Sequence, residues 1–238
     1  MNSSKFPASC VLFDLDGTLL DTAADIANAL NATLQYENKN AISYNEIRNA
    51  ISLGTTALIM LAFGNKQSKK DLLRRQNFFL NYYEKNICID TTIFTGMENV
   101  LDELEQQGVK WGVVTNKAAF LTDALLDELN LSERACSVIS GDTLKYRKPS
   151  PEQLYFAATQ CNVLATECIY VGDAQRDIES GNRAGMLSLL ASYGYIARDD
   201  QPETWQANGI IQSPEEILDW LDYATDFAHS NHDELLCH

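Results

Sequence analysis

The sequence predicts an α/β protein: a mostly parallel sheet covered by helices on both faces, with an all-helical segment inserted after the first strand. Two observations support this fold class. From residue 97 onward, short apolar runs rich in β-branched residues alternate with helical patterns, which is typical of parallel sheets. Residues 21–90 instead show only the three- and four-residue apolar spacing of helices.

The elements are predicted in chain order. The first strand covers 9–13 and ends at an acidic turn. Helices of the inserted segment, indicated by apolar stripes, cover 22–37, 44–51, 55–63 and 70–86. Later helices cover 97–107, 118–129, 151–162, 177–184 and 214–227. Later strands cover 110–115, 137–140, 168–172, 186–191 and 209–212. We therefore expect a core domain of residues 1–20 and 91–238, and a cap domain of residues 21–90 over the sheet edge where ligands bind.

Composition limits the partners and the location. Acidic residues outnumber basic ones, 33 to 18, and the net charge is -15. Nucleic acids and anionic membranes are therefore not expected as partners, because both bind basic surfaces. No secretory signal or apolar run of about 20 residues is present. The six cysteines lack Cys-x-x-Cys spacing, which predicts reduced thiols in a cytoplasmic protein.

Asp14 and Asp16 come at the end of the first predicted strand. Residues two apart in an extended segment point to the same side, so the two carboxylates repel each other unless a cation or a proton lies between them. Gly17 lets the backbone turn sharply after the pair. A solvated turn is the alternative, which the preceding apolar run weakens.

Polar residues end a second strand and occupy a later loop. Thr115 and Asn116 end the strand over 110–115, where their hydroxyl, amide and backbone N–H groups can hold phosphate oxygens. A helix cap is the alternative for this pair. Lys148 precedes Pro149, which disfavours the helical region, and its ammonium can neutralise an aspartate–phosphate pair. A surface lysine is the alternative.

Asp173 and Asp177 follow the strand over 168–172. Asp173 lies at the strand tip and Asp177 about one helical turn later, where an acidic first turn of a helix is the alternative. Three carboxylates, Asp14, Asp16 and Asp173, suit Mg²⁺, which prefers a few oxygen ligands with water and substrate phosphate. Together with the lysine and the polar strand ends, they indicate a phosphoryl-transfer site.

These segments resemble the four motifs of the haloacid dehalogenase superfamily, in the right order and over nearly the whole chain. The resembling segments are Asp14-Leu15-Asp16-Gly17-Thr18, Thr115-Asn116, Lys148-Pro149, and Gly172-Asp173 through Asp177. The resemblance implies a Rossmann-like core, a helical cap and a phosphatase. It also implies Mg²⁺ held by Asp14, the backbone carbonyl of Asp16, and Asp173, with Asp177 in support.

The resemblance further implies a mechanism. Asp14 attacks phosphorus and forms an aspartyl-phosphate, which splits one difficult step into two. Asp16 protonates the leaving alcohol and then activates water. Lys148, Thr115 and Asn116 hold the phosphoryl oxygens.

Within the superfamily, the chain resembles bacterial phosphoglycolate phosphatases, and a subgroup similar to N-acetylmuramic acid 6-phosphate phosphatases. We expect a small phosphorylated metabolite as substrate, selected by cap residues 52–56, and the choice between the two esters stays open. A phosphomutase is less favoured because residues 52–56 offer no obvious base, and a dehalogenase because those relatives lack an acid at the position of Asp16. A receiver-type signalling domain is much shorter and lacks a helical insertion. No oligomeric state is predicted.

Overall fold

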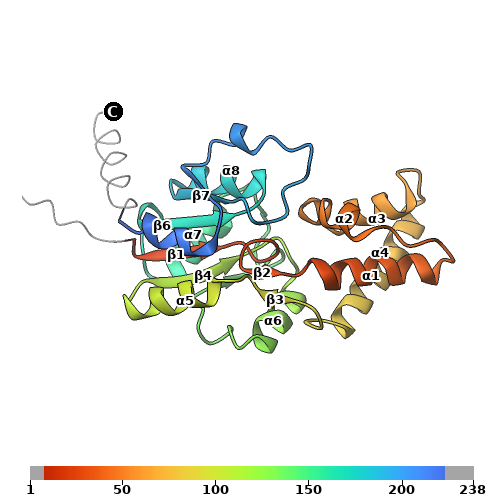
Figure 1. Ribbon diagram of the computed structural model, residues 1–238, viewed down its shortest axis with the longest axis horizontal. Helices are drawn as coiled ribbons and strands as arrows, with labels where there is room; N and C mark the ends of the chain where they lie inside the picture. The colour runs from red at the N-terminus through yellow and green to blue at the C-terminus, as the bar shows by residue number, and fades with distance from the viewer. Residues whose placement is uncertain (1–7, 223–238) are drawn as a thin grey trace, which may run out of the picture.

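The computed structural model describes residues 8–222 and contains a six-stranded sheet in the order β5-β4-β1-β6-β7-β8 (Figure 1). All five strand pairings are parallel. The strands are β1 (Cys10–Phe13), β4 (Lys110–Val114), β5 (Val138–Ile139), β6 (Cys168–Gly172), β7 (Leu187–Ala191) and β8 (Gly209–Ile211). The predicted α/β fold class with a mostly parallel sheet is confirmed.

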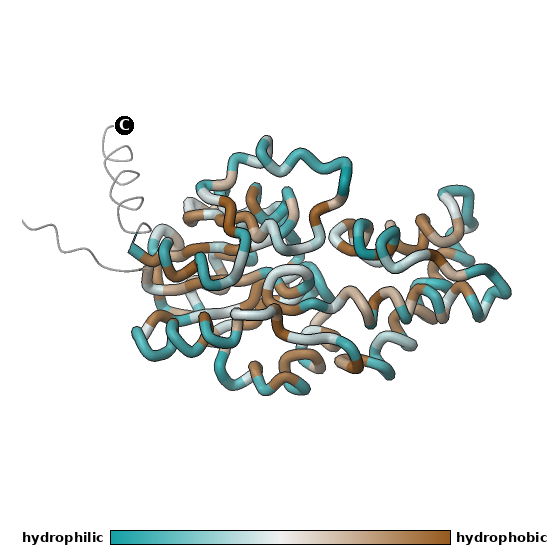
Figure 2. Tube along the Cα trace, viewed as in Figure 1, coloured by the Kyte–Doolittle hydropathy of each residue, from teal (hydrophilic) through white to brown (hydrophobic). Residues whose placement is uncertain are grey.

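Helices cover both faces of this sheet. Alternate residues of β1 show this, because Val11 and Phe13 belong to one apolar cluster whereas Cys10 and Leu12 belong to another. The first cluster includes residues of α5 (Met97–Gln106), α6 (Ala119–Glu128) and the 3-10 helix η4 (Pro214–Trp220). On the other face lie α7 (Glu152–Gln160) and α8 (Gln175–Ala184). Apolar residues accordingly follow the central strands in Figure 2.

The inserted segment folds as a group of helices beside the sheet (Figure 1). It contains α1 (Ala23–Tyr36), α2 (Tyr44–Arg48), η1 (Ile51–Leu53), α3 (Thr55–Phe63) and α4 (Lys69–Lys85). Their apolar faces enclose a separate core that includes Leu30, Ile59 and Phe79. We call this helical group the cap. The domain boundaries at residues 20 and 91 stay a prediction. No helix within residues 8–222 is long and apolar enough to span a membrane.

Two short strands at the base of the cap were not predicted. β2 (Leu20–Asp21) pairs antiparallel with β3 (Thr92–Ile93), so the chain enters and leaves the cap side by side. Each strand has only two residues, too few for a periodic signal. The predicted α-helix from residue 214 is also corrected: residues 214–220 form 3-10 helix, and the end of the predicted helix lies outside the described residues. The remaining short 3-10 segments are η2 (Ala165–Glu167) and η3 (Pro202–Thr204).

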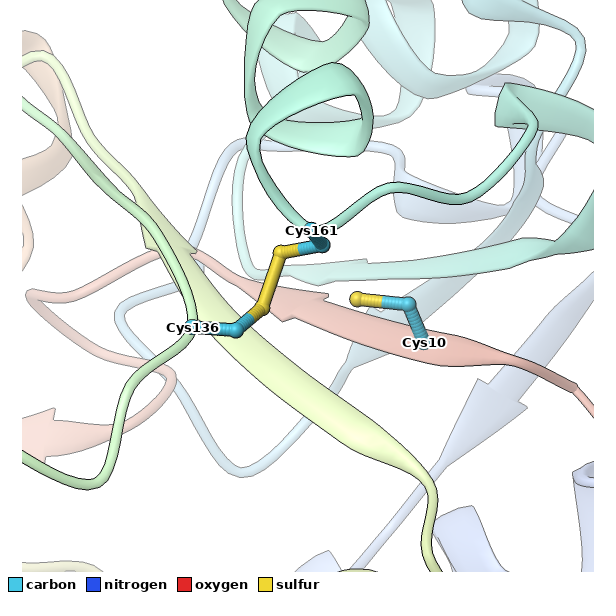
Figure 3. Close-up of side chains that lie close together, drawn as sticks. All are labelled: Cys10, Cys136 and Cys161. Atoms are coloured by element: carbon cyan, nitrogen blue, oxygen red, sulfur yellow. A yellow bond between two sulfur atoms is a disulfide. The ribbon is translucent and has the colours of Figure 1, made fainter.

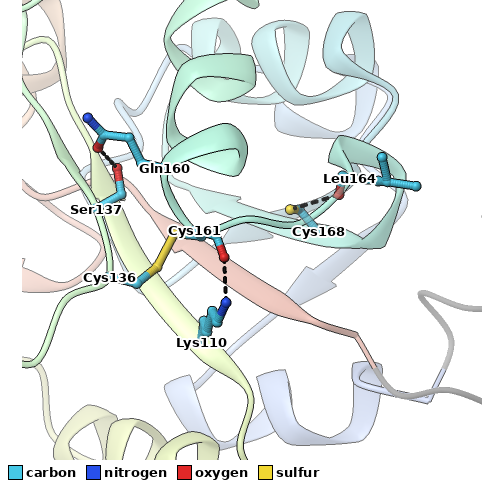
Figure 4. Close-up of a disulfide and its surroundings, with 7 residues drawn as sticks. All are labelled: Lys110, Cys136, Ser137, Gln160, Cys161, Leu164 and Cys168. Atoms are coloured by element: carbon cyan, nitrogen blue, oxygen red, sulfur yellow. Dashed lines mark hydrogen bonds between the residues drawn. A yellow bond between two sulfur atoms is a disulfide. The ribbon is translucent and has the colours of Figure 1, made fainter.

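The prediction of reduced thiols is wrong for two cysteines. Cys136 and Cys161 form a disulfide between the segment before β5 and the end of α7 (Figure 4). Lys110 on β4 donates a hydrogen bond to the Cys161 carbonyl at 2.5 Å. The buried thiol of Cys10 lies beside the disulfide (Figure 3). The partners are 25 residues apart, so only the tertiary fold brings them together, and no local spacing could have indicated the bond.

Candidate functional site

The predicted site residues meet where the three central strands end. Asp14 follows β1, Thr115 follows β4 and Asp173 follows β6, and these strands are neighbours in the sheet. The parallel strands end at the same edge. The strand order reverses at β1, which has β4 on one side and β6 on the other, and open α/β sheets bind ligands at such a point. Gly17 turns the chain away with φ +85°, and a Cβ there would collide with the Asp173 carboxylate.

Lys148 lies at the centre of the charged cluster. Its Nζ is 2.9 Å from Asp14 Oδ1 and 2.7 Å from Asp177 Oδ1, and its side chain has no exposed surface. The same ammonium donates hydrogen bonds to the Val114 carbonyl and the Tyr170 hydroxyl. The alternative of a surface lysine is therefore wrong, and one buried cation binds two carboxyl groups.

Asn116 holds the backbone of Lys148. Its Oδ1 accepts a hydrogen bond from the Lys148 N–H at 3.1 Å, and its Nδ2 donates to the Lys148 carbonyl at 3.2 Å. The side chain of Asn116 is thus committed to the lysine loop. Thr115 is buried, and its Oγ1 accepts a hydrogen bond from the Lys117 N–H.

Burial and nearby charges shift the pKa values of the three buried carboxyl groups in different directions. Burial alone would raise the pKa of Asp14, but the Lys148 ammonium and the Arg176 guanidinium outweigh it and hold that pKa below its ordinary value. For Asp177, burial prevails over Lys148, so its pKa is raised. Burial, followed by the nearby charges of Asp14 and Asp177, raises the pKa of Asp173 to about 8. Asp14 is therefore the carboxylate best prepared to stay anionic.

Asp173 and Asp177 also organise the backbone. Asp173 Oδ2 accepts a hydrogen bond from the Tyr195 N–H at 2.7 Å, whereas its Oδ1 is buried without a partner. Asp177 Oδ2 accepts the Ala174 N–H at 3.0 Å at the start of α8, so it acts as the acidic group of a helix first turn and also binds Lys148. The predicted start of this helix at residue 177 was two residues late.

Oxygen atoms of Asp14, Asp173 and Asp177 all lie within 4.8 Å of one another. The donors are hard oxygens, and Asp173 Oδ1 is buried without a hydrogen-bond partner. Such a set fits Mg²⁺. The carboxylate of Asp16 lies outside this group, and the predicted contact through its backbone carbonyl stays a prediction.

The side chain of Asp16 instead connects the core with the cap. Its Oδ1 accepts hydrogen bonds from Thr22 Oγ1 at 2.7 Å and from Lys117 Nζ at 2.8 Å. Lys117 Nζ also donates to the Tyr83 hydroxyl on α4 at 3.0 Å. Lys117 had no predicted role, although it directly follows Thr115-Asn116. Its partner Tyr83 comes from the cap, and sequence spacing does not indicate that contact.

A cavity of about 530 Å³ lies between the core edge and the cap. Residues that line it include Asp14, Asp16 and Arg176 from the core, and Ser52, Thr55 and Phe79 from the cap. Gly54, predicted with its neighbours to select the substrate, also lines the cavity. Asp14 and Asp16 thus lie on the core wall, and the predicted selection loop forms part of the cap wall. Lys148, Asp173 and Asp177 are not among the lining residues.

Comparison with known proteins identifies the class. The model of the haloacid dehalogenase-like hydrolase family matches residues 11–191, and the chain belongs to this family. The resemblance drawn from the four motifs is confirmed, and with it the prediction that the chain is an enzyme.

Individual relatives are more specific. A phosphoglycolate phosphatase of Xanthomonas campestris is 40% identical over 90% of this chain and 96% of its own length. An N-acetylmuramic acid 6-phosphate phosphatase of Pseudomonas putida is 36% identical over the same shares. The crystal structure of a predicted phosphoglycolate phosphatase from Haemophilus somnus superposes with a TM-score of 0.81 at 24% identity, covering 92% of this chain and 99% of that one.

Proposed function

We propose that this chain is a Mg²⁺-dependent phosphatase that hydrolyses a small phosphate monoester through an aspartyl-phosphate on Asp14. The observation that carries the proposal is the buried Lys148 ammonium between Asp14 and Asp177, beside Asp173. This network keeps Asp14 anionic at the edge of the cavity.

Asp14 is the nucleophile. Lys148 and the Leu15 N–H, at 2.7 Å, both bind its Oδ1, which orients the carboxylate and leaves Oδ2 for attack on phosphorus. The covalent intermediate then separates loss of the alcohol from attack by water. Lys148 offsets negative charge on the phosphoryl oxygens throughout.

Asp16 is the general acid and then the general base. Both hydrogen bonds from Thr22 and Lys117 end on its Oδ1, which fixes the group and leaves Oδ2 to exchange a proton with the leaving oxygen or water. Thr115 contributes polar groups to the phosphoryl site. Asn116 acts chiefly by positioning Lys148, which refines its expected role as a direct phosphate contact.

Asp14 and Asp173, with the Asp16 carbonyl, would hold Mg²⁺, and Asp177 would support them. When bound, the ion offsets the charge of the phosphoryl group and of the carboxylate cluster. The raised pKa of Asp173 and its unpartnered oxygen support this assignment.

Two esters are candidates for the substrate. The names of the most similar relatives favour 2-phosphoglycolate. The cavity volume also leaves room for a larger ester such as N-acetylmuramic acid 6-phosphate. One water molecule occupies roughly 30 Å³ in the liquid. If each non-hydrogen atom of a ligand took the same volume, a cavity of about 530 Å³ would hold about 18 such atoms. Phosphoglycolate has about half that number. Bonded atoms need less space than waters, so a sugar phosphate of about 24 such atoms also fits.

The proposal also includes the expected partner and location of the protein. A small phosphorylated metabolite is the partner, without nucleic acid or membrane, and the cytoplasm is the location. A phosphomutase stays less favoured because no titratable side chain occurs in residues 52–56. The Cys136–Cys161 disulfide opposes the proposed location, because disulfides are rare in the reducing cytosol.

Turnover of both esters, measured as phosphate release with purified protein and Mg²⁺, tests the proposal. We expect Asp14→Asn to lower kcat by about 10⁴-fold or more, because the nucleophile is lost, with an unchanged circular dichroism spectrum. EDTA should abolish wild-type turnover, and added Mg²⁺ should restore it. Substantial turnover by Asp14→Asn would contradict the assignment of Asp14 as nucleophile. Turnover that survives chelation would contradict the requirement for Mg²⁺. The ratio of kcat/KM for the two esters identifies the preferred one.

A further inference from the structure

Arg176 is a cation of the cavity wall whose charge helps keep Asp14 anionic, and the proposed mechanism gives it no contact with the substrate. It lies in the first turn of α8, between Asp173 and Asp177, and lines the cavity. One guanidinium nitrogen donates a hydrogen bond to the Ser52 carbonyl of the cap. Its Nε is buried without a hydrogen-bond partner. A buried donor left unpaired costs about 1–3 kcal/mol, so this geometry favours an added acceptor.

The two buried lysines at the site are already paired. Lys148 binds two carboxylates, and Lys117 binds the Asp16 carboxylate and the Tyr83 hydroxyl. Within residues 8–222, by contrast, Arg176 forms no ion pair within 4.0 Å. Burial alone would lower the pKa of Arg176, but the fields of Asp177, Asp14 and Asp173 raise it, so the guanidinium stays charged close to the carboxylate cluster.

We propose that Arg176 binds the carboxylate carried by the substrate and thereby determines the preference for an acid over a neutral phosphate ester. This rests on the proposed function, in which the phosphoryl group occupies the Asp14 and Lys148 end of the cavity. A guanidinium presents paired N–H donors that match a carboxylate, which an ammonium does not. The position of Arg176 between the charged cluster and the Ser52 carbonyl places this second anion subsite beside the cap.

Both candidate esters carry such a group. In phosphoglycolate a single methylene separates the ester oxygen from the carboxylate. In N-acetylmuramic acid 6-phosphate the carboxylate belongs to the lactyl group, across the sugar from the phosphate. These spacings differ too much for one rigid subsite, so the pair in which the acid is preferred identifies the ester whose carboxylate Arg176 binds.

Matched esters test the assignment. 2-Phosphoglycolate is compared with 2-hydroxyethyl phosphate, and N-acetylmuramic acid 6-phosphate with N-acetylglucosamine 6-phosphate, which lack the carboxylate. We expect the wild type to prefer the acid of at least one pair in kcat/KM, and Arg176→Gln to reduce that preference by about 10- to 100-fold, the range of a charged hydrogen bond. Arg176→Lys should keep part of the preference. Equal losses of Arg176→Gln on acid and neutral ester would overturn the assignment.

Arg147 provides the matched control, because it is an exposed cation of the same cavity. Arg147→Gln should keep the preference for the acid; loss of the preference in this variant, with retention in Arg176→Gln, would also overturn the assignment. Binding of phosphonoacetate and methylphosphonate, measured by calorimetry, gives a readout without turnover. Tighter binding of phosphonoacetate that requires Arg176 would support the subsite even if no ester were hydrolysed, an outcome that would reject the proposed function alone. Equal binding to wild type and Arg176→Gln would reject the subsite alone.

Discussion

The two walls of the cavity differ in how they hold their polar groups. On the core side, Asp14 lines the cavity, and Asp173 and Asp177 lie beside it. All three are at most 3% exposed, and each accepts a hydrogen bond or binds a cation. On the cap wall, the polar groups are neutral, and Gly54 and Thr56 are exposed. Reaction chemistry that depends on charge needs low dielectric and fixed partners. Selection of a substrate needs shape and a few replaceable contacts.

Lys117 joins the two walls. It binds Asp16 of the core and the Tyr83 hydroxyl of the cap. Burial raises the pKa of Tyr83 to about 12, so this hydroxyl stays neutral at ordinary pH. The Asp16 carboxylate, our proposed proton-transfer group, is therefore positioned in part by a contact with the cap.

The largest effect is expected from Lys148→Met, which removes the shared cation of the core side. Asp14 and Asp177 would then be buried without their counter-ion, and the free energy of unfolding should fall by about 3–5 kcal/mol. Urea denaturation at pH 7 measures the change. Lys145→Met is the control, because Lys145 is exposed in the same loop and its replacement should change stability by less than about 0.5 kcal/mol. Equal stability of both variants would contradict the central role of Lys148.

The second effect concerns the disulfide, which fastens the core and has no counterpart among the described residues of the cap. Its loop of 25 residues predicts a loss of about 3 kcal/mol when Cys136 and Cys161 are both replaced by serine. Thermal unfolding without reductant measures this loss. A thiol count in denaturant gives the direct check: two fewer thiols before reduction than after. An equal count before and after would show that the bond does not form in the isolated protein.

The third effect is a dependence of Mg²⁺ affinity on pH. Asp173 has a pKa of about 8 in the folded protein, against 3.8 ordinarily. The metal-free folded state therefore binds the extra proton, and its stability falls as pH rises from about 4 towards 8. Mg²⁺ must displace this proton, so its affinity should fall about tenfold for each pH unit below 8.

Calorimetry in two buffers of different ionisation enthalpy measures the displaced proton. About one proton should be released per ion at pH 6.5 and almost none above pH 9. Asp173→Asn should remove both the proton release and most of the affinity. An affinity that does not change between pH 6.5 and 8 would contradict the shifted pKa.

Features that depend on local sequence could be predicted. The shared position of Asp14, Thr115 and Asp173 could be predicted because each directly follows a strand, and parallel strand ends meet at one edge of a sheet. Helix period alone predicted the bounds of α3 (Thr55–Phe63) without error. Local sequence patterns were therefore sufficient to predict most of the fold and the place where the charged residues gather.

Contacts that depend on tertiary distance were not predictable. The ion pair of Lys117 with Asp16 spans 101 residues, and the contact of Arg176 with Ser52 spans 124. Neither leaves a periodic or spacing signal, because each arises when the cap docks on the core. The commitment of the Asn116 amide to Lys148 likewise depends on side-chain direction, which the strand pattern does not specify.

The smallest effect is expected at the cap wall. Thr55 lines the cavity and offers a neutral hydroxyl whose hydrogen bond to a substrate contributes about 0.5–1.5 kcal/mol. Thr55→Ala should therefore raise KM for the preferred ester by about 2- to 10-fold, with little change in kcat, because the groups that react lie on the other wall. Steady-state kinetics measures both constants, and Thr95→Ala, at an exposed threonine outside the cavity, should change neither. A loss confined to kcat would place Thr55 in the reaction chemistry and end the division between a charged wall that reacts and a neutral wall that selects.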